Sequence, residues 1–247
     1  MDEEGLQRGT MIELTEWIRA AQFPSRPWLI LGKGPTFSRH TEFDLGRYNL
    51  ISLNHAVREL KVDVAHIIDA DVVEDCAERL LENCSFLLMP RRPHVHFDPG
   101  PLMLEDFIRR IPVLRKMDER GSLVWYNLSS GKPVETSPII RARHFSAEAA
   151  LNILARMGVK TVRSLGVDGG RGYSPAFKDL EGKTLLANRR ESFDIQFQEI
   201  AAIVRKHSID FAPLAGPSKR SWPRRLVRAI QRSLGIFQSP PSSHEKG

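Results

Sequence analysis

A Gly-Lys-Gly-Pro sequence at residues 32–35 follows the short apolar run 28–31. This pattern is typical of a buried parallel strand that is followed by a tight turn. Because glycine accepts positive φ and has no Cβ, a phosphate or a ribose would approach the peptide N–H groups of this turn closely. The pattern therefore predicts a nucleotide-binding turn made of Gly32, Lys33, Gly34 and Pro35.

Two better-known phosphate-binding turns do not fit this stretch. A dinucleotide-binding fingerprint needs a third glycine, whereas the later positions here are Phe37 and Ser38. No Gly-Lys-Ser/Thr follows directly, so the turn is not a P-loop. An ordinary strand-to-helix turn of an α/β domain stays open as the alternative interpretation.

Two carboxylates, Asp69 and Asp71, flank a single residue at the end of a β-branched run. In an extended segment both side chains would point to the same side. There they could hold Mg²⁺ against a pyrophosphate. Alternatively, one of them caps the helix that follows. Both interpretations remain open.

A general base and phosphate-binding groups are predicted further along the chain. His144 is the first candidate for the base that deprotonates an acceptor hydroxyl, and Asp168 is the second. Lys33 and Arg143 would bind the leaving phosphate, and Tyr173 would donate a hydrogen bond to it. A polar residue near a helix start is the alternative explanation of His144.

His94 and His96 alternate in a segment rich in proline. A zinc site would need further ligands at suitable spacing, and none is evident in the sequence. We therefore expect these histidines to be loop residues that contact the acceptor.

The composition is that of a globular protein. The chain has 247 residues, of which 41% are hydrophobic and 27% charged. The pair Cys76 and Cys84 does not make a metal site by itself, so we expect reduced thiols. The acidic start has no apolar signal region, and no apolar run is long enough to span a bilayer. These features predict a cytoplasmic protein.

Short strand patterns alternate with helical ones along the chain. The predicted strands are 28–31, 48–53, 62–69, 85–89, 122–127, 161–167 and 209–212. The predicted helices are 10–22, 72–83, 102–117 with a kink near Pro112, 145–157 and 191–207, with loops at 90–101 and 128–138. This alternation predicts one α/β domain over residues 1–215, Rossmann-like, with a mostly parallel sheet and helices on both faces.

Polar residues end most of the predicted strands. In a parallel sheet the ligand crevice lies beyond the carboxyl ends of the strands, near the point where strand order reverses. We therefore expect a nucleotide site lined by the following strand-end residues: 32–35, Asn54, Asp69 with Asp71, Ser129 with Ser130, and 168–173.

The order of these motifs resembles the bacterial sialyltransferases of the Campylobacter type. In that family one strand ends in Gly-x-Gly-Pro and a second in Asn. A Ser-Gly then opens an Ala-rich helix, which leads through Gly-x-Lys to a strand ending in Gly-Ile-Asp and a Tyr-bearing loop. The matching segments here are 28–35, the strand before Asn54, 145–150 and 155–168. The outline is also similar to the wider family that includes the archaeal pterin diphosphokinase, which has acidic residues after the third strand.

This resemblance covers residues 28–212 and implies a domain that binds a cytidine nucleotide sugar. It implies a nucleotide pocket lined by Gly32, Gly34, Asn54, Ser146 and Asp168. The chain departs from the family pattern at three places. Lys33 replaces an asparagine, Ala147 replaces the glycine of Ser-Gly, and no histidine stands in the region before Asp194, where the family has its catalytic one.

Residues 216–247 form a basic tail that accounts for most of the net charge of +6. An apolar stripe at helical spacing, with arginines on the other faces, is made of Trp222, Leu226, Ile230 and Leu234. Such a helix over 219–237 predicts binding to an anionic membrane surface. Packing on the body, or an arm that touches nucleic acid, are the alternatives. Because the body is close to neutral, we expect no nucleic-acid partner. The end beyond residue 237 should be disordered.

Taken together, these features predict a glycosyltransferase at the inner face of a membrane. It would use a nucleotide sugar and a glycan acceptor in the synthesis of surface polysaccharide or glycolipid, with no cofactor required. One alternative is a pterin-type diphosphokinase, which would need Mg²⁺ on Asp69 and Asp71. The other is a nucleotide-binding module without catalysis.

Overall fold

The computed structural model describes residues 11–96, 98–129, 136–181 and 192–215. The predicted amphipathic tail 219–237 and Ser130 lie outside these residues. Among the described helices, none combines the length and the apolar character needed to cross a bilayer.

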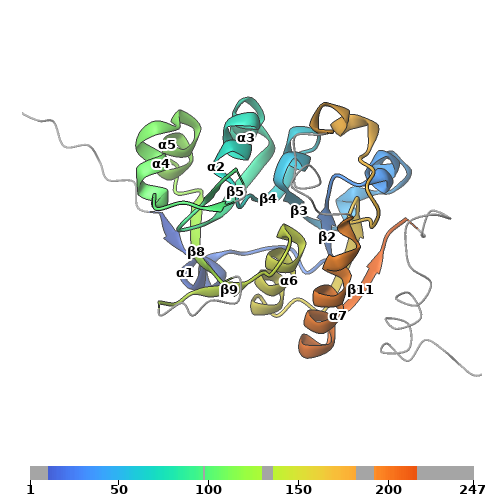
Figure 1. The fold of residues 1–247 in the computed structure, drawn as a ribbon. Coiled ribbons are helices and arrows are strands. Elements are labelled where there is room, and N and C mark those ends of the chain that lie inside the picture. The colour runs from blue at the N-terminus through green and yellow to red at the C-terminus, as the bar shows by residue number, and fades with distance from the viewer. Residues whose placement is uncertain (1–10, 97, 130–135, 182–191, 216–247) are drawn as a thin grey trace, which may run out of the picture.

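A parallel sheet of nine strands forms the centre of the described part (Figure 1). Its order is β1-β8-β5-β4-β3-β2-β10-β11, and β9 pairs with β8. The strands are β1 (Ile12–Glu13), β2 (Trp28–Leu31), β3 (Asn49–Leu53), β4 (Val62–His66), β5 (Cys84–Pro90), β8 (Leu123–Ser129), β9 (Ile139–Arg141), β10 (Thr161–Leu165) and β11 (Asp210–Pro213). This confirms the predicted α/β class and the single Rossmann-like domain.

Helices cover both faces of the sheet (Figure 1). On one face lie α2 (Ala70–Asp75), α3 (Ala77–Asn83), α4 (Leu104–Arg110) and α5 (Pro112–Glu119). On the other lie α1 (Leu14–Ala20), α6 (Ser146–Arg156) and α7 (Gln196–His207). Short 3₁₀ helices connect the layers: η1 (Pro35–Glu42), η2 (Leu45–Arg47), η3 (Asn54–Arg58), η4 (Pro175–Leu180) and η6 (Phe193–Ile195).

The strand β2 shows why the central strands are apolar throughout. Leu29 and Leu31 pack into the core beneath α2–α5, whereas Trp28 and Ile30 pack into the core beneath α1, α6 and α7. Successive strand side chains point to opposite faces, so a strand covered on both faces needs a continuous apolar run.

Strand order reverses between β2 and β10. From β2 the chain proceeds through β3 and β4 to β5 on one side, while β10 and β11 lie on the other. A crevice at the carboxyl ends of β2 and β10 is therefore the expected ligand site of this topology.

Two predicted helices differ from the structure. The predicted helix 10–22 begins as strand β1, whose Ile12 pairs with Val124 of β8. The segment predicted as one helix, 72–83, contains two helices, because the helix is interrupted at Cys76 between α2 and α3. The predicted break near Pro112 is confirmed, since this proline opens α5.

The proline-rich segment 90–101 is more regular than expected. It contains a two-stranded antiparallel hairpin made of β6 (His94–Val95) and β7 (Asp98–Pro99). No proline stands in β6. Pro99 lies in β7, and a pairing only two residues long tolerates a residue that cannot donate a backbone hydrogen bond. Strand β9 was not predicted either, because it is only three residues long.

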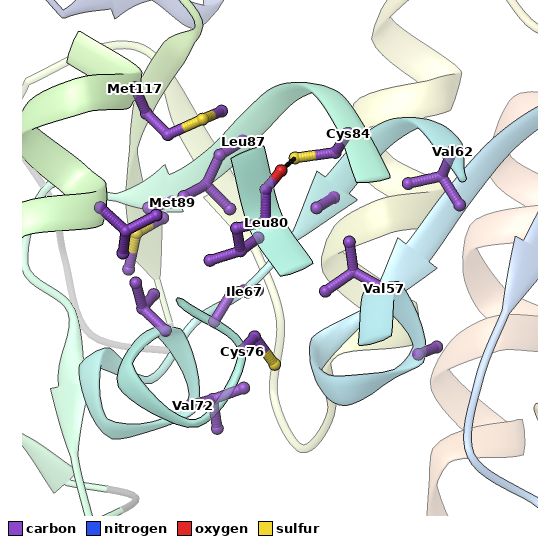
Figure 2. Close-up of a cluster of buried hydrophobic side chains, with 14 of the residues drawn as sticks. Val57, Val62, Ile67, Val72, Cys76, Leu80, Cys84, Leu87, Met89 and Met117 are labelled. Carbon is purple, nitrogen blue, oxygen red and sulfur yellow. Dashed lines mark hydrogen bonds between the residues drawn. The ribbon is translucent and has the colours of Figure 1, made fainter. Parts of the chain in front are cut away.

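Figure 2 shows part of the core between the sheet and α2–α5, with Leu80 among the buried side chains of strands and helices. The Sγ of Cys84 donates a hydrogen bond of 3.1 Å to the carbonyl of Leu80. Burial raises the pKa of both Cys76 and Cys84 to about 12. Both cysteines are free thiols, as predicted, and burial keeps them protonated at neutral pH.

We expect Leu80→Ala to lower the free energy of unfolding by about 2–5 kcal/mol, because Leu80 is fully buried and its truncation leaves a cavity. Denaturant unfolding measures this loss. Leu81→Ala is the matched control, since Leu81 is only partly buried. Equal losses in the two variants would contradict the prediction.

Candidate functional site

A cleft of about 320 Å³ opens at the carboxyl ends of β2, β3, β4 and β10. Most of the predicted site residues line it: Gly32, Lys33, Gly34, Asn54, Asp69, Asp71, Arg143, His144, Ser146, Asp168 and Tyr173. Pro35 opens η1 and Ser129 ends β8, and neither lines the cleft. The strand ends thus bring together segments that are far apart in the sequence.

The turn after β2 packs tightly against the turn after β10. The N–H of Gly32 donates to the carbonyl of Leu165 at 2.8 Å, and the N–H of Gly34 donates to that of Gly166 at 2.7 Å. A Cβ on Gly32 would lie 2.4 Å from the Gly166 oxygen. The glycines therefore permit the close approach of two backbones.

This packing corrects one expectation. The peptide N–H groups of Gly32 and Gly34 were expected to face a phosphate, but both are used in hydrogen bonds between the turns. Gly34 also has an ordinary φ of −66°, so the turn does not need it for a left-handed conformation.

Asp168 ties the same two turns together. Its carboxylate accepts a hydrogen bond of 2.7 Å from the N–H of Thr36 and bonds of 2.9 Å from the Thr36 hydroxyl. That hydroxyl in turn accepts from the N–H of Gly166 at 2.8 Å. Burial raises the pKa of Asp168, and the bonds from Thr36 oppose the rise. With its oxygens occupied in this way, Asp168 is better suited to a structural role than to that of a base.

Asn54 and Ser146 meet where β3 ends. Asn54 has a φ of +51°, a left-handed conformation that asparagine tolerates better than most residues. The Ser146 hydroxyl, at the start of α6, donates to the Asn54 Oδ1 at 3.4 Å. An uncommon backbone conformation beside a cleft is typical of functional sites.

A buried glutamate, Glu148, shapes the loop that carries Arg143 and His144. Its carboxylate accepts hydrogen bonds from the N–H groups of Arg143 (2.6 Å), His144 (3.1 Å) and Phe145 (3.2 Å). Desolvation raises the pKa of Glu148, while these bonds oppose the rise. The Arg143 guanidinium also lies 3.3 Å from the Glu199 carboxylate. Glu148 was not predicted, because Phe145, and not Ser or Thr, stands at the N-cap.

Lys33 is a cation in a poorly solvated place. Burial lowers its pKa to about 8, although the charge of Asp69 raises it. The Nζ atom lies 5.3 Å from the ring centroid of Tyr173, a cation–π distance. A lysine with so perturbed a pKa, in a cleft, is a functional candidate.

His55 also lines the cleft and was not predicted. It is buried, and its Nε2 lies 3.2 Å from the Asp75 carboxylate. Burial, followed by the charge of Lys33, lowers the pKa of His55 to about 4, so the imidazole is neutral at pH 7. The sequence signal that could have identified His55 as a site residue was its position directly after Asn54, at the end of β3.

The acidic wall of the cleft differs from the predicted arrangement. Asp69 and Asp71 were expected in an extended segment, but α2 begins at Ala70, which puts Asp71 in a helical turn. Asp69 stands at the N-cap without a capping bond from its side chain. Each carboxylate instead has a histidine beside it: His94 Nδ1 is 4.0 Å from Asp69 Oδ1, and His96 Nδ1 is 3.7 Å from Asp71 Oδ2.

The described residues contain no group of three or more His, Cys, Asp and Glu side chains that could hold a metal ion. Asp69 and Asp71 would therefore need oxygens from a bound phosphate and from water to complete a Mg²⁺ site. That arrangement fits Mg²⁺ only together with a phosphorylated ligand.

We expect Gly34→Ala to lower the free energy of unfolding by about 1–3 kcal/mol, because the added Cβ would lie 2.6 Å from the Asp168 carboxylate. Thermal or denaturant unfolding measures the change. Gly100→Ala is the control, since its Cβ would have no neighbour closer than 4.0 Å. A Gly34→Ala variant as stable as the control would show that the two turns are not tightly packed.

The amine of Lys33 should react with acetic anhydride with a midpoint near pH 8, well below the ordinary lysine value of 10.5, because burial disfavours its charged form. The amine is charged below this midpoint and neutral, hence nucleophilic, above it. Mass spectrometry of tryptic or other peptides gives the labelling of Lys33 at each pH. A midpoint near 10.5 would contradict the described burial.

No family model matches the chain, and no curated protein matches it significantly. The resemblance to the Campylobacter-type sialyltransferases therefore stays a prediction. What this cleft does has to be argued from its own residues.

Proposed function

We propose that the protein is a glycosyltransferase that binds a nucleotide sugar in this cleft and transfers the sugar to a hydroxyl group. The observation that carries the proposal is the cleft at the switch point between β2 and β10, with a desolvated Lys33 inside it. Open α/β sheets bind nucleotides at this position.

Side chains, more than backbone groups, would bind the phosphate. The N–H groups of Gly32 and Gly34 are already used, whereas Lys33 and Arg143 both line the cleft. A cation in a poorly hydrated cleft stabilises the charge that develops on a leaving phosphate. Tyr173, over whose ring Lys33 lies, would donate its hydroxyl to the same group.

The nucleoside would occupy the neighbouring part of the cleft. Asn54 and Ser146 offer an amide and a hydroxyl for a ribose or a base. Phe145 and Phe193, with ring centroids 5.3 Å apart, supply an apolar wall there. Cytidine is the base that the sequence resemblance implies.

The predicted tail would localise this activity to a membrane surface. A basic helix over 219–237 on an anionic membrane surface would hold the enzyme beside lipid-linked acceptors. The acceptor class that follows is a membrane glycolipid or a growing polysaccharide.

Calorimetric titration of CMP and ATP, each with and without Mg²⁺, tests the proposal. We expect CMP to bind without Mg²⁺. ATP binding that requires Mg²⁺ would instead support diphosphate transfer with Mg²⁺ held by Asp69 and Asp71, which both line the cleft. Slow hydrolysis of a CMP-sugar without acceptor would distinguish an enzyme from a binding module. Absence of any nucleotide binding would overturn the proposal.

Lys33→Met should weaken CMP binding about tenfold to a hundredfold, because a hydrogen bond to a charged group contributes about 1.5–3 kcal/mol. Wild-type affinity should also fall as the pH rises through about 8, where Lys33 loses its proton. Lys178→Met is the control, since Lys178 is exposed and does not line the cleft. Equal affinities of Lys33→Met and wild type would contradict the assigned role.

A further inference from the structure

The geometry of the sheet separates the two ends of the cleft. Lys33, the proposed phosphate-binding lysine, follows β2 at the switch point, whereas β4 lies two strands away from β2. Neighbouring strands are about 4.8 Å apart, so the end of β4 lies about 10 Å from that of β2. A base that activates an acceptor must stand away from the leaving phosphate, so it belongs near β4.

The hairpin after β5 brings His94 to this far end. The N–H of His94 donates to the carbonyl of Ile68 at 3.0 Å, and His94 forms a parallel bridge with Asp69. The backbone at His94 is thus fixed alongside the end of β4. The imidazole is 22% exposed and lines the cleft, so it is both held and accessible.

Asp69 lies where it can orient this imidazole. Its side chain is only 9% exposed, and its Oδ1 is 4.0 Å from the Nδ1 of His94. A carboxylate beside Nδ1 favours the tautomer with its proton there, which leaves Nε2 as the proton acceptor. A separation of 4.0 Å exceeds a hydrogen bond, but catalytic hydrogen bonds often tighten only when substrate binds.

The two other histidines of the cleft are less suited to this task. His55 has its Nε2 turned to Asp75, and its pKa of about 4 makes it a weak base. His144 belongs to the nucleotide side, since Ser146, two residues later, donates to Asn54. The family's histidine before the last helix has no counterpart here, so the base has to come from another part of the fold.

We propose that His94 is the general base of the transfer and that Asp69 positions it; this inference rests on the proposed function. The Nε2 of His94 takes the proton of the acceptor hydroxyl while the hydroxyl oxygen bonds to the anomeric carbon of the donor. The bond from that carbon to the phosphate oxygen breaks, and its electron pair leaves with the nucleotide. Lys33 stabilises the phosphate, and the imidazolium later releases its proton to water.

His94→Gln tests the role of the imidazole, with transfer from a CMP-sugar and CMP affinity as the two readouts. We expect kcat to fall about 10²–10⁴-fold, as for loss of a general base, with CMP affinity unchanged within about twofold. His96→Gln is the matched control, because His96 lies in the same hairpin segment but is 85% exposed and does not line the cleft. In His94→Ala, added imidazole should restore part of the activity, which also shows that this variant folds.

Asp69→Asn tests the positioning role. We expect a lower kcat with little change in KM, and partial recovery in Asp69→Glu. The double variant Asp69→Asn/His94→Gln should be no slower than His94→Gln alone, because residues that act as a unit are not additive. A purely structural Asp69 would lower the activity of the His94 variant further.

The outcomes separate this inference from the proposed function. Transfer by His94→Gln at the wild-type rate, or rescue by imidazole of a His144→Ala variant but not of His94→Ala, would overturn the inference and leave the proposed function standing. A wild-type protein that neither binds CMP nor transfers a sugar would overturn both.

Discussion

The hydrogen-bonded contact between the turns after β2 and β10 is the constraint on which the site depends. The N–H groups of Gly32, Gly34 and Thr36, the hydroxyl of Thr36 and the carboxylate of Asp168 close it. Because the contact joins the two strands at which strand order reverses, it holds together two turns that line the cleft. It also directs the side chain of Lys33, whose neighbours Gly32 and Gly34 have no room for a Cβ, into that cleft.

Much of the fold and of the cleft could be predicted from local sequence, for a geometric reason. Parallel strands place all their carboxyl ends at one edge of the sheet, so residues at the ends of nearby strands are candidates for one site. Asn54, Asp69 and Asp168 could therefore be grouped without knowing the strand order, and all three line one cleft. The apolar run of β2 was equally clear, because burial on both faces leaves no polar position in it.

What could not be predicted depends on partners far along the chain. Strand β1 is only two residues long and exists because Ile12 finds Val124 in β8. The hairpin that contains His94 was not predicted because its segment is rich in proline. The position of His94 next to Asp69 is fixed by a single β-bridge. Asp168 was a candidate base by position alone, and only the hydroxyl and N–H of Thr36, 132 residues away, explain how its carboxylate is used.

The charges of Lys33, Asp69 and Asp71 in the cleft suit a ligand that is anionic at one end. Lys33 is disfavoured as a cation by burial, and the charge of Asp69 only partly compensates. Since the free protein holds this cation at an energetic cost, an arriving phosphate would raise the pKa of Lys33 again and favour proton uptake. Beyond Lys33, the carboxylates of Asp69 and Asp71 repel a second anion but accept hydrogen bonds from hydroxyl groups. In the proposed function, this arrangement of charges would favour a phosphorylated sugar with its phosphate towards β2 and β10 and its reacting carbon towards β4.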